Sequence, residues 1–235
     1  MNEHGLFRRR QLPHIDGEDK PYFITACLHG SISAVGLARI RLFRDELDAR
    51  PLPKNFTPTQ WEAHKHKLMF KFVDDLLDGA TPIEHLSDSR LATIVQDAFL
   101  HFAEERYDLF AFVVMPSHHH WVFLPKPIWI EQSFRSTSKN GLRRSPREAI
   151  SHSIQSFTST SCNRILGRSG PFWQTETFDH FARDEEELIR IIHYIEHNPV
   201  KAGFVEQPHE WQWSSAAIRY RLHLDPGQPI PKPVG

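Results

Sequence analysis

The chain has 235 residues, 40% of them hydrophobic and 24% charged, which suits one globular domain with insertions. No run of about 18 apolar residues occurs, and the first residues lack the apolar stretch of a secretory signal, so neither a membrane helix nor a leader is expected. A net charge of −1 argues against a protein that coats DNA non-specifically, and two distant cysteines, Cys27 and Cys162, favour a cytoplasmic protein without disulfides.

The first half of the chain predicts a flexible arm, one strand and three helices. Residues 1–20 are polar, and residues 22–28 are rich in strand-forming side chains. Apolar residues recur at helical spacing in three later stretches. Thr57 and Gln60 form the sequence signature of a capping box at the start of the second of them. The expected helices cover 35–49, 57–77 and 88–105, and the region of about 45–105 is expected to be a helical insertion.

The second half predicts a strand hairpin followed by two helices. Residues 109–115 are continuously apolar, as in a strand buried on both faces, and 118–124 form a second strand after a short break. Residues 128–146 read as a polar loop, and 147–166 as a helix. A strand is expected within 172–181, then a helix that is capped by Asp184 and ended by Pro199. Residues 221–235 read as a Pro-rich tail, so the main domain would span 21–220.

Positive charge is concentrated between residues 134 and 170, where one acid, Glu148, accompanies seven basic residues. A local basic face can bind nucleic acid even on a neutral protein, but a solvated loop would have the same composition. The charge pattern alone leaves both interpretations open. The basic residues are Arg135, Lys139, Arg143, Arg144, Arg147, Arg164 and Arg168.

Two residue pairs could carry chemistry. His118 and His120 are two apart in a predicted strand, so both project from one face and could hold a metal ion, whereas His119 points the opposite way. Tyr194 and Asn198 are four apart on a predicted helix and would share an edge. Each pair also has a plain structural interpretation, as packed histidines and as a tyrosine at the border of the core.

Several motifs together resemble the HUH single-tyrosine transposases, in particular the REP-associated tyrosine transposases and their insertion-sequence relatives. The string VMPSHHH at 114–120 resembles the family's HUH motif. GPFWQ at 170–174, RDEE at 183–186, YIEHNPVKAG at 194–203 and WQWSS at 211–215 resemble further family stretches, and YFIT at 22–25 resembles the first core strand. The matches follow family order from about residue 20 to 217. Two departures are His119, where the family usually has a hydrophobic residue, and the long 45–100 region.

The resemblance implies an α+β fold, with a ferredoxin-like antiparallel sheet, helices on one face and a helical insertion. It gives His118 and His120 the role of ligands to a divalent metal, Mg²⁺ or Mn²⁺, and makes Tyr194 the nucleophile. Asn198 falls where related enzymes place a third polar ligand. The implied activity is nicking and strand transfer of single-stranded DNA through a 5′-phosphotyrosine. Because a tyrosine hydroxyl has a pKa near 10, it needs help from the metal at neutral pH.

The expected partner is single-stranded or hairpin DNA, bound by a monomer or homodimer that is cytoplasmic and nucleoid-associated. Phosphate contacts are expected from Arg143, Arg144, Arg147, Arg164 and Arg168. The tryptophans could stack on bases, but core packing is the usual role of such residues.

Two other hypotheses compete with this one. The first is a domesticated protein that binds hairpin DNA but no longer transposes. The second is a zinc hydrolase built on His118, His119 and His120 with help from His193 and His197, although strand geometry turns His119 away and no His-Glu-x-x-His motif occurs.

Overall fold

A four-stranded antiparallel sheet forms the centre of the computed structural model, which describes residues 20–77, 81–134, 145–174 and 178–233. Its strands are β1 (Tyr22–Cys27), β2 (Tyr107–Val114), β3 (His118–Pro125) and β4 (Phe178–Phe181), in the spatial order β2-β3-β1-β4. Both central strands pair antiparallel with their neighbours. This is the strand order of a ferredoxin-like sheet, so the predicted α+β class and the predicted hairpin of β2 and β3 are confirmed.

Helices cover both faces of the sheet, so the predicted placement of helices on one face is corrected. The two connections between strands place α3 (Ser89–His101) and α5 (Pro146–Ile165) on one face, where they pack on Ile24, Trp121 and Phe123. The helix α6 (Glu185–Lys201) covers the opposite face through Leu188, Ile192 and Ile195. The reason lies in β2 and β3, whose residues are almost all buried and therefore need apolar partners on both sides.

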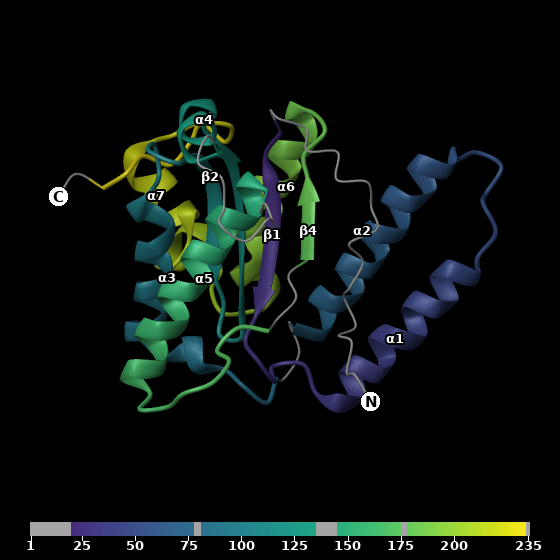
Figure 1. Cartoon of the computed structure of the whole chain (residues 1–235), viewed down its shortest axis with the longest axis horizontal. Coiled ribbons are helices and arrows are strands. Elements are labelled where there is room, and N and C mark those ends of the chain that lie inside the picture. The colour runs from purple at the N-terminus through teal and green to yellow at the C-terminus, as the bar shows by residue number, and fades with distance from the viewer. Residues whose placement is uncertain (1–19, 78–80, 135–144, 175–177, 234–235) are drawn as a thin grey trace.

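The helices α1 (Ala34–Ala49) and α2 (Pro58–Leu77) form a hairpin that stands beyond β4, at one side of the molecule (Figure 1). The Thr57 and Gln60 side chains exchange hydrogen bonds with each other's backbone N–H groups, as the predicted capping box requires. The hairpin has a small apolar cluster of its own, formed by Ile40, Val73 and Leu77 with Cys27 and Ile32. The predicted insertion of about 45–105 has other bounds than this hairpin, because α1 begins at Ala34 and α3, which lies inside the predicted region, packs on the sheet.

Three local predictions are corrected by the structure. Part of the predicted loop at 128–146 is the helix α4 (Pro127–Phe134), whereas residues 135–144 lie outside the described ones. The strand expected at 172–181 is limited to β4, preceded by an isolated bridge between Trp173 and Leu28. Pro199 does not end α6, which continues to Lys201. A proline so near the helix end removes one hydrogen bond, and its burial lets packing offset that loss.

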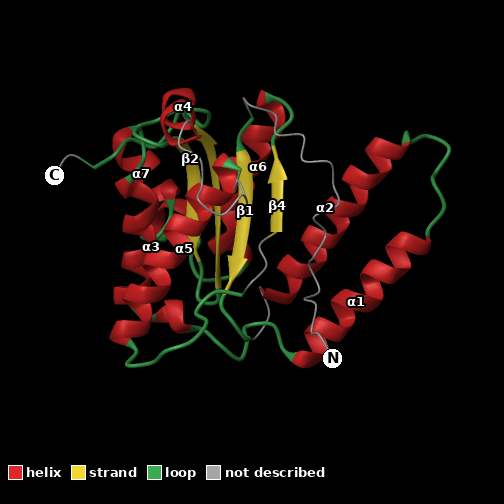
Figure 2. Ribbon diagram, in the orientation of Figure 1, coloured by secondary structure: helices red, strands yellow, loops and turns green. Residues whose placement is uncertain are grey.

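The chain after α6 returns to the outer edge of the sheet beside β2 (Figure 2). This last segment contains the single turn η2 (Pro208–Glu210) and the helix α7 (Ser215–Leu222), whereas the other single turn, η1 (His85–Ser87), comes directly before α3. In the Pro-rich end, Ile230 is buried and its N–H donates to the Leu109 carbonyl at 2.6 Å. The predicted arm at 1–20 falls outside the described residues except for Lys20. Within the described part of the chain, no helix is long and apolar enough to cross a membrane.

Candidate functional site

The side chains of His118 and His120 lie on the face of the sheet that α6 covers. Their ring centroids are 4.8 Å apart, and both residues are buried, with exposed fractions of 1% and 0%. The predicted placement on one face of a strand is thus seen in the structure. His119 points to the opposite face, where its ring packs edge-on against Phe99 and Trp173.

Hydroxyl groups orient the two rings through their Nδ1 atoms. Thr25 Oγ1 lies 2.7 Å from His120 Nδ1, because Thr25 is the register partner of His120 on β1. Ser117 Oγ lies 3.1 Å from His118 Nδ1. A ring whose Nδ1–H donates to an oxygen keeps a lone pair on Nε2, the arrangement usual in histidines that bind metals.

Tyr194 and Asn198 approach the same place from α6. The Tyr194 ring lies 5.6 Å from the His120 ring, and it also contacts Phe23 and Phe70 edge-on. Asn198 Nδ2 lies 3.4 Å from both the Tyr194 hydroxyl and His120 Nε2. Because α6 continues through Pro199, Asn198 stays helical and faces the imidazoles one turn after Tyr194. The structure therefore brings together the four residues singled out in the sequence.

A fifth residue, Asp74 of α2, was missed in the sequence. Its Oδ1 atom lies 3.3 Å from His120 Nε2, and its carboxylate, at 2% exposure, is as buried as the imidazoles. Its other oxygen, Oδ2, lies 3.1 Å from Lys201 Nζ at the end of α6. A signal for it does exist: Asp74 follows Phe70 by four residues, so a carboxylate falls beside an apolar stripe where a solvated acid is not expected.

The donor atoms of this site fit a divalent cation. Asp74, His118 and His120 each offer one ligand atom within 4.8 Å of the others. His118 Nε2 and Asn198 Oδ1 are buried and have no hydrogen-bond partner among the described residues. Orphaned buried polar atoms are rare in native proteins, and a shared ion would satisfy them together. The mixture of imidazole nitrogen with carboxylate and amide oxygen suits Mg²⁺ or Mn²⁺, with Mn²⁺ better matched to the imidazoles.

The protonation states of His118 and Asp74 agree with metal binding. Burial, with the neighbouring His120 as a second cause, holds the pKa of His118 well below its ordinary value, so the ring is neutral near pH 7. Burial alone would raise the pKa of Asp74. Hydrogen bonding to His120 and Tyr194 outweighs burial and places that pKa far below its usual range. An ionised carboxylate and a neutral imidazole are the forms that bind metal ions.

His119 is the departure from the family pattern, and the structure shows how the fold accommodates it. Both ring nitrogens are buried without a hydrogen-bond partner among the described residues, and burial lowers the pKa of the ring to about 3. His119 is therefore a neutral, aromatic-like core residue. It is separated from His118 and His120 by the sheet, so it does not contribute to their site.

Those of the predicted phosphate-binding arginines that the structure describes do not lie beside Tyr194. Arg143 and Arg144 lie outside the described residues. Arg147, Arg164 and Arg168 belong to α5 or follow it, on the side of the sheet opposite to α6. Arg164 is exposed, whereas Arg168 lies 2.8 Å from His85 Nε2 and donates to the Pro171 carbonyl.

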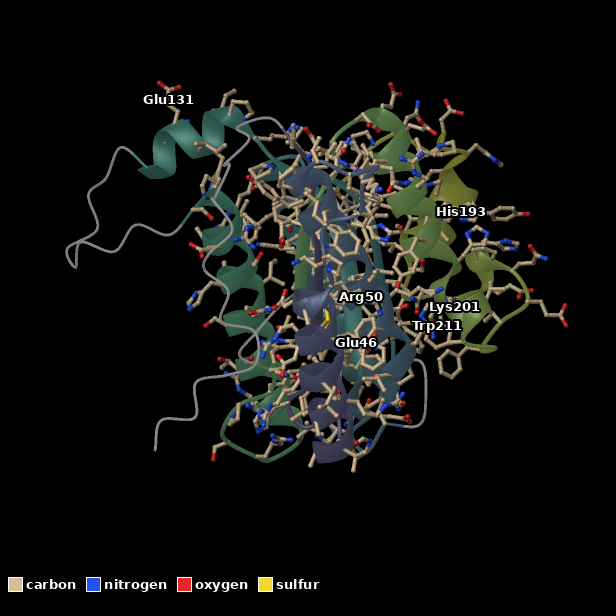
Figure 3. All side chains as sticks on the ribbon, turned by 90° about the vertical axis from the view of Figure 1, so that its right-hand side faces the viewer. Glu46, Arg50, Glu131, His193, Lys201 and Trp211 are labelled. Atoms are coloured by element: carbon tan, nitrogen blue, oxygen red, sulfur yellow. The ribbon has the colours of Figure 1, made fainter. Side chains whose placement is uncertain are left out.

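Other residues considered in the sequence also lie away from the site. His193 is exposed on α6 and stacks on His197 at 3.7 Å, and Figure 3 shows it at the outer side of the molecule, so the zinc-hydrolase set is not assembled. Trp121 and Trp173 are core residues, and Trp173 Nε1 donates to Thr158. Trp211 packs against the exposed Phe204 and donates to the Val114 carbonyl.

Comparison with known proteins places the chain beside the transposases whose motifs it resembles. No family model matches it. A Haemophilus influenzae protein named "Putative REP-associated tyrosine transposase" is 40% identical over 53 residues, which are 23% of this chain and 30% of that protein. The chain thus matches less than a third of the length of this relative. The relative's name agrees with the family that the motifs indicated.

A solved structure also aligns with the chain. It is the structure of a REP-associated tyrosine transposase bound to a REP hairpin, and the alignment covers 92% of this chain and 86% of that one. The TM-score is 0.46 and the sequence identity 16%.

Proposed function

We propose that this chain, a relative of the REP-associated tyrosine transposases, nicks and rejoins single-stranded DNA through a phosphotyrosine formed on Tyr194. The observation that carries the proposal is the meeting of the Tyr194 hydroxyl with the buried donor set of β3 and α6. Asn198 Nδ2 lies 3.4 Å both from that hydroxyl and from His120 Nε2, so one side chain connects the nucleophile to the imidazole pair.

In the proposed centre, His118, His120 and Asn198 hold Mg²⁺ or Mn²⁺. The bound cation would supply Lewis-acid stabilisation of charge on the scissile phosphate and on the leaving oxygen. The protein's own contribution is to position the groups. Thr25 and Ser117 fix the imidazoles, and Phe23 and Phe70 hold the Tyr194 ring edge-on.

The covalent step follows from the nucleophile. Tyr194 loses its phenolic proton to water, and its oxygen attacks the phosphorus of a phosphodiester. The bond from phosphorus to the 3′ oxygen breaks, and the leaving oxygen takes a proton from water, which gives a free 3′-OH and a 5′-phosphotyrosine. Attack of another 3′-OH on that linkage rejoins DNA and releases the tyrosine. The phosphodiester energy is conserved in the covalent intermediate, so no nucleotide cofactor is needed.

Hairpin or single-stranded DNA is the proposed substrate, because the sequence motifs resemble those of the REP-associated tyrosine transposases, the family in the relative's name. Arg143, Arg144, Arg147, Arg164 and Arg168 are proposed to contact phosphates. Since α5 lies across the sheet from Tyr194, DNA that uses both regions would have to pass around the edge of the sheet.

A nicking assay on single-stranded hairpin oligonucleotides with Mn²⁺ tests the proposal. The wild-type protein should cleave, and Tyr194→Phe, which keeps the ring and its packing, should bind equally well and lose cleavage by at least about 10³-fold. Tyr220→Phe is a matched control on an exposed tyrosine. Cleavage that survives in Tyr194→Phe would refute the role of Tyr194. Tight binding without any cleavage by the wild type would favour the domesticated DNA-binding protein.

A further inference from the structure

Several side chains of α2 contact the sheet and α6, and its Val73 and Leu77 share a buried cluster with Cys27 of β1. Phe70 packs edge-on against Phe23 and Tyr194. Lys67 Nζ lies 3.0 Å from Glu187 Oε1 on α6. These contacts are modest beside the apolar clusters of the sheet, and the charged contact involves a half-exposed lysine, so it contributes little.

Asp74 is the exception among these contacts, because it is buried inside the candidate site. Its two oxygens have different surroundings. Oδ2 accepts from Lys201 Nζ at 3.1 Å, whereas Oδ1 is turned toward the imidazoles and lies 3.3 Å from His120 Nε2. The lysine therefore fixes the carboxylate in one orientation and leaves the second oxygen among the atoms that would surround a metal ion.

We infer that Asp74 is a further ligand of the divalent cation, so that metal binding stabilises the docking of the α1–α2 hairpin on the catalytic face. The inference rests on the proposed metal centre at His118 and His120 and adds to it a residue from outside the HUH motif and α6. A buried carboxylate beside two imidazoles is costly unless a cation compensates it, and Lys201 compensates only one of its oxygens. Carboxylate oxygen is also the ligand type that Mg²⁺ and Mn²⁺ prefer.

Because Asp74 lies on α2, a metal ion bound to it would affect the docking of the α1–α2 hairpin. A ligand that binds only the docked arrangement stabilises that arrangement by mass action. Since Asp74 and the imidazoles belong to separate elements, a shared cation would connect α2 directly to β3. The ion pair of Lys201 with Asp74 places this connection where α2 meets the end of α6. Figure 3 shows Lys201 on the same side of the molecule as Trp211 and His193.

Calorimetric titration with Mn²⁺ tests the ligand role. Asp74→Asn keeps the size of the side chain and removes its charge, and it should weaken Mn²⁺ binding by about tenfold or more. The matched control is Asp75→Asn. It makes the same charge change on the next residue of α2, and Asp75 also contacts Lys201, at 3.3 Å, but it is exposed and is not part of the donor cluster. The affinity of the Asp75→Asn protein for Mn²⁺ should remain within about twofold of wild type.

Hydrogen exchange of the wild-type protein tests, without any substitution, whether Mn²⁺ stabilises the docking of α2. Added Mn²⁺ should slow amide exchange in residues 67–77 of α2 as well as in β3. The slowing in α2 should disappear in Asp74→Asn and persist in Asp75→Asn. If Asp74→Asn does not fold, as judged by circular dichroism, the wild-type comparison still decides the question.

The outcomes separate this inference from the proposed function. Normal Mn²⁺ affinity in Asp74→Asn, or Mn²⁺ protection confined to β3, would overturn the ligand role of Asp74 and leave the metal centre intact. Failure of the wild type to bind Mn²⁺, or binding that is unchanged in the double variant His118→Ala, His120→Ala, would instead refute the metal centre on which both proposals depend.

Discussion

At the scale of single residues, burial determines which groups can react. The imidazoles, Asp74 and Asn198 are enclosed by β3, α2 and α6, whereas the ring of Tyr194 lies at the border of that enclosure. His119 shows the same effect without a functional role, because burial among aromatic rings makes it neutral. The identity of a residue therefore says less about its chemistry than the face of the strand on which it lies.

The two cysteines offer a direct check on burial. Burial, with nearby carboxylates as a second cause, raises the pKa of both Cys27 and Cys162 to about 12. The thiolate is the reactive form, so neither thiol should react at pH 8 in the folded protein. Titration with a chromogenic disulfide reagent should detect almost no thiol in buffer and two thiols per chain in 8 M urea. Rapid labelling of either cysteine in buffer would show that the packing around it is wrong.

At the scale of secondary-structure elements, a buried ion pair holds α6 and α7 in place. Arg219 Nε lies 3.0 Å from Glu196 Oε1, and the same guanidinium donates to the carbonyls of Phe110, Asp225 and Gln228. Glu196 is two residues after Tyr194 on α6. One arginine thus connects the helix that carries Tyr194 to β2 and to the Pro-rich end of the chain.

Loss of that arginine should be costly. Arg219→Ala would leave the buried Glu196 carboxylate with Ser215 but without its ion-pair partner, and would remove a donor from three carbonyl groups, so we expect a loss of about 3–5 kcal/mol in the free energy of unfolding. Urea denaturation measures the change. Arg221→Ala, at an exposed position of the same helix, should change stability by less than about 0.5 kcal/mol. A loss below about 1 kcal/mol in Arg219→Ala would show that the network is not needed to hold α6.

Most elements could be predicted from the sequence because their signals are local. The capping box at Thr57 and the apolar runs of β2 and β3 each depend on a few neighbouring residues, and α2 and the β2–β3 hairpin were expected where they occur. Pro199 misled the prediction of the end of α6, because burial of the proline offsets a local preference. The helix α4 was missed since its short apolar stretch lies at the start of a polar, Ser-rich region.

The candidate site could be predicted only in part, for a different reason. His118, His120, Tyr194 and Asn198 lie within short motifs whose spacing indicates which residues share a face. Asp74 is 44 residues before His118, and nothing in its neighbourhood specifies where α2 docks. Its one local signal, a carboxylate four residues after Phe70 beside an apolar stripe, does not indicate which residues it meets, so tertiary structure was required to find this one.

At the scale of the whole molecule, the sheet separates two functional regions. One face carries Tyr194 and the donor cluster under α6 and α2, and the other carries the described arginines of α5. The net charge of the whole chain is near neutral, so any attraction of DNA depends on where these basic residues lie rather than on overall charge.

The proposed role of the α5 arginines can be measured by salt dependence. Arg164→Ala, at an exposed position, should weaken binding of hairpin DNA uniformly across sequences and lower the slope of log Kd against log salt by about 1. Arg90→Ala on α3 is the control, because Arg90 already pairs with Asp88 at 2.6 Å. An unchanged slope in Arg164→Ala would place the DNA elsewhere and restrict it to the face that carries Tyr194.

The central claim is that Tyr194 becomes covalently bonded to DNA, and mass spectrometry of the trapped adduct tests it most directly. The wild-type protein is incubated with a single-stranded hairpin oligonucleotide and Mn²⁺, denatured, and digested with nuclease and protease. The account predicts a peptide that carries a nucleotide phosphate on Tyr194, and no such peptide from Tyr194→Phe. An adduct on any other residue, or DNA cleaved without any adduct, would contradict it.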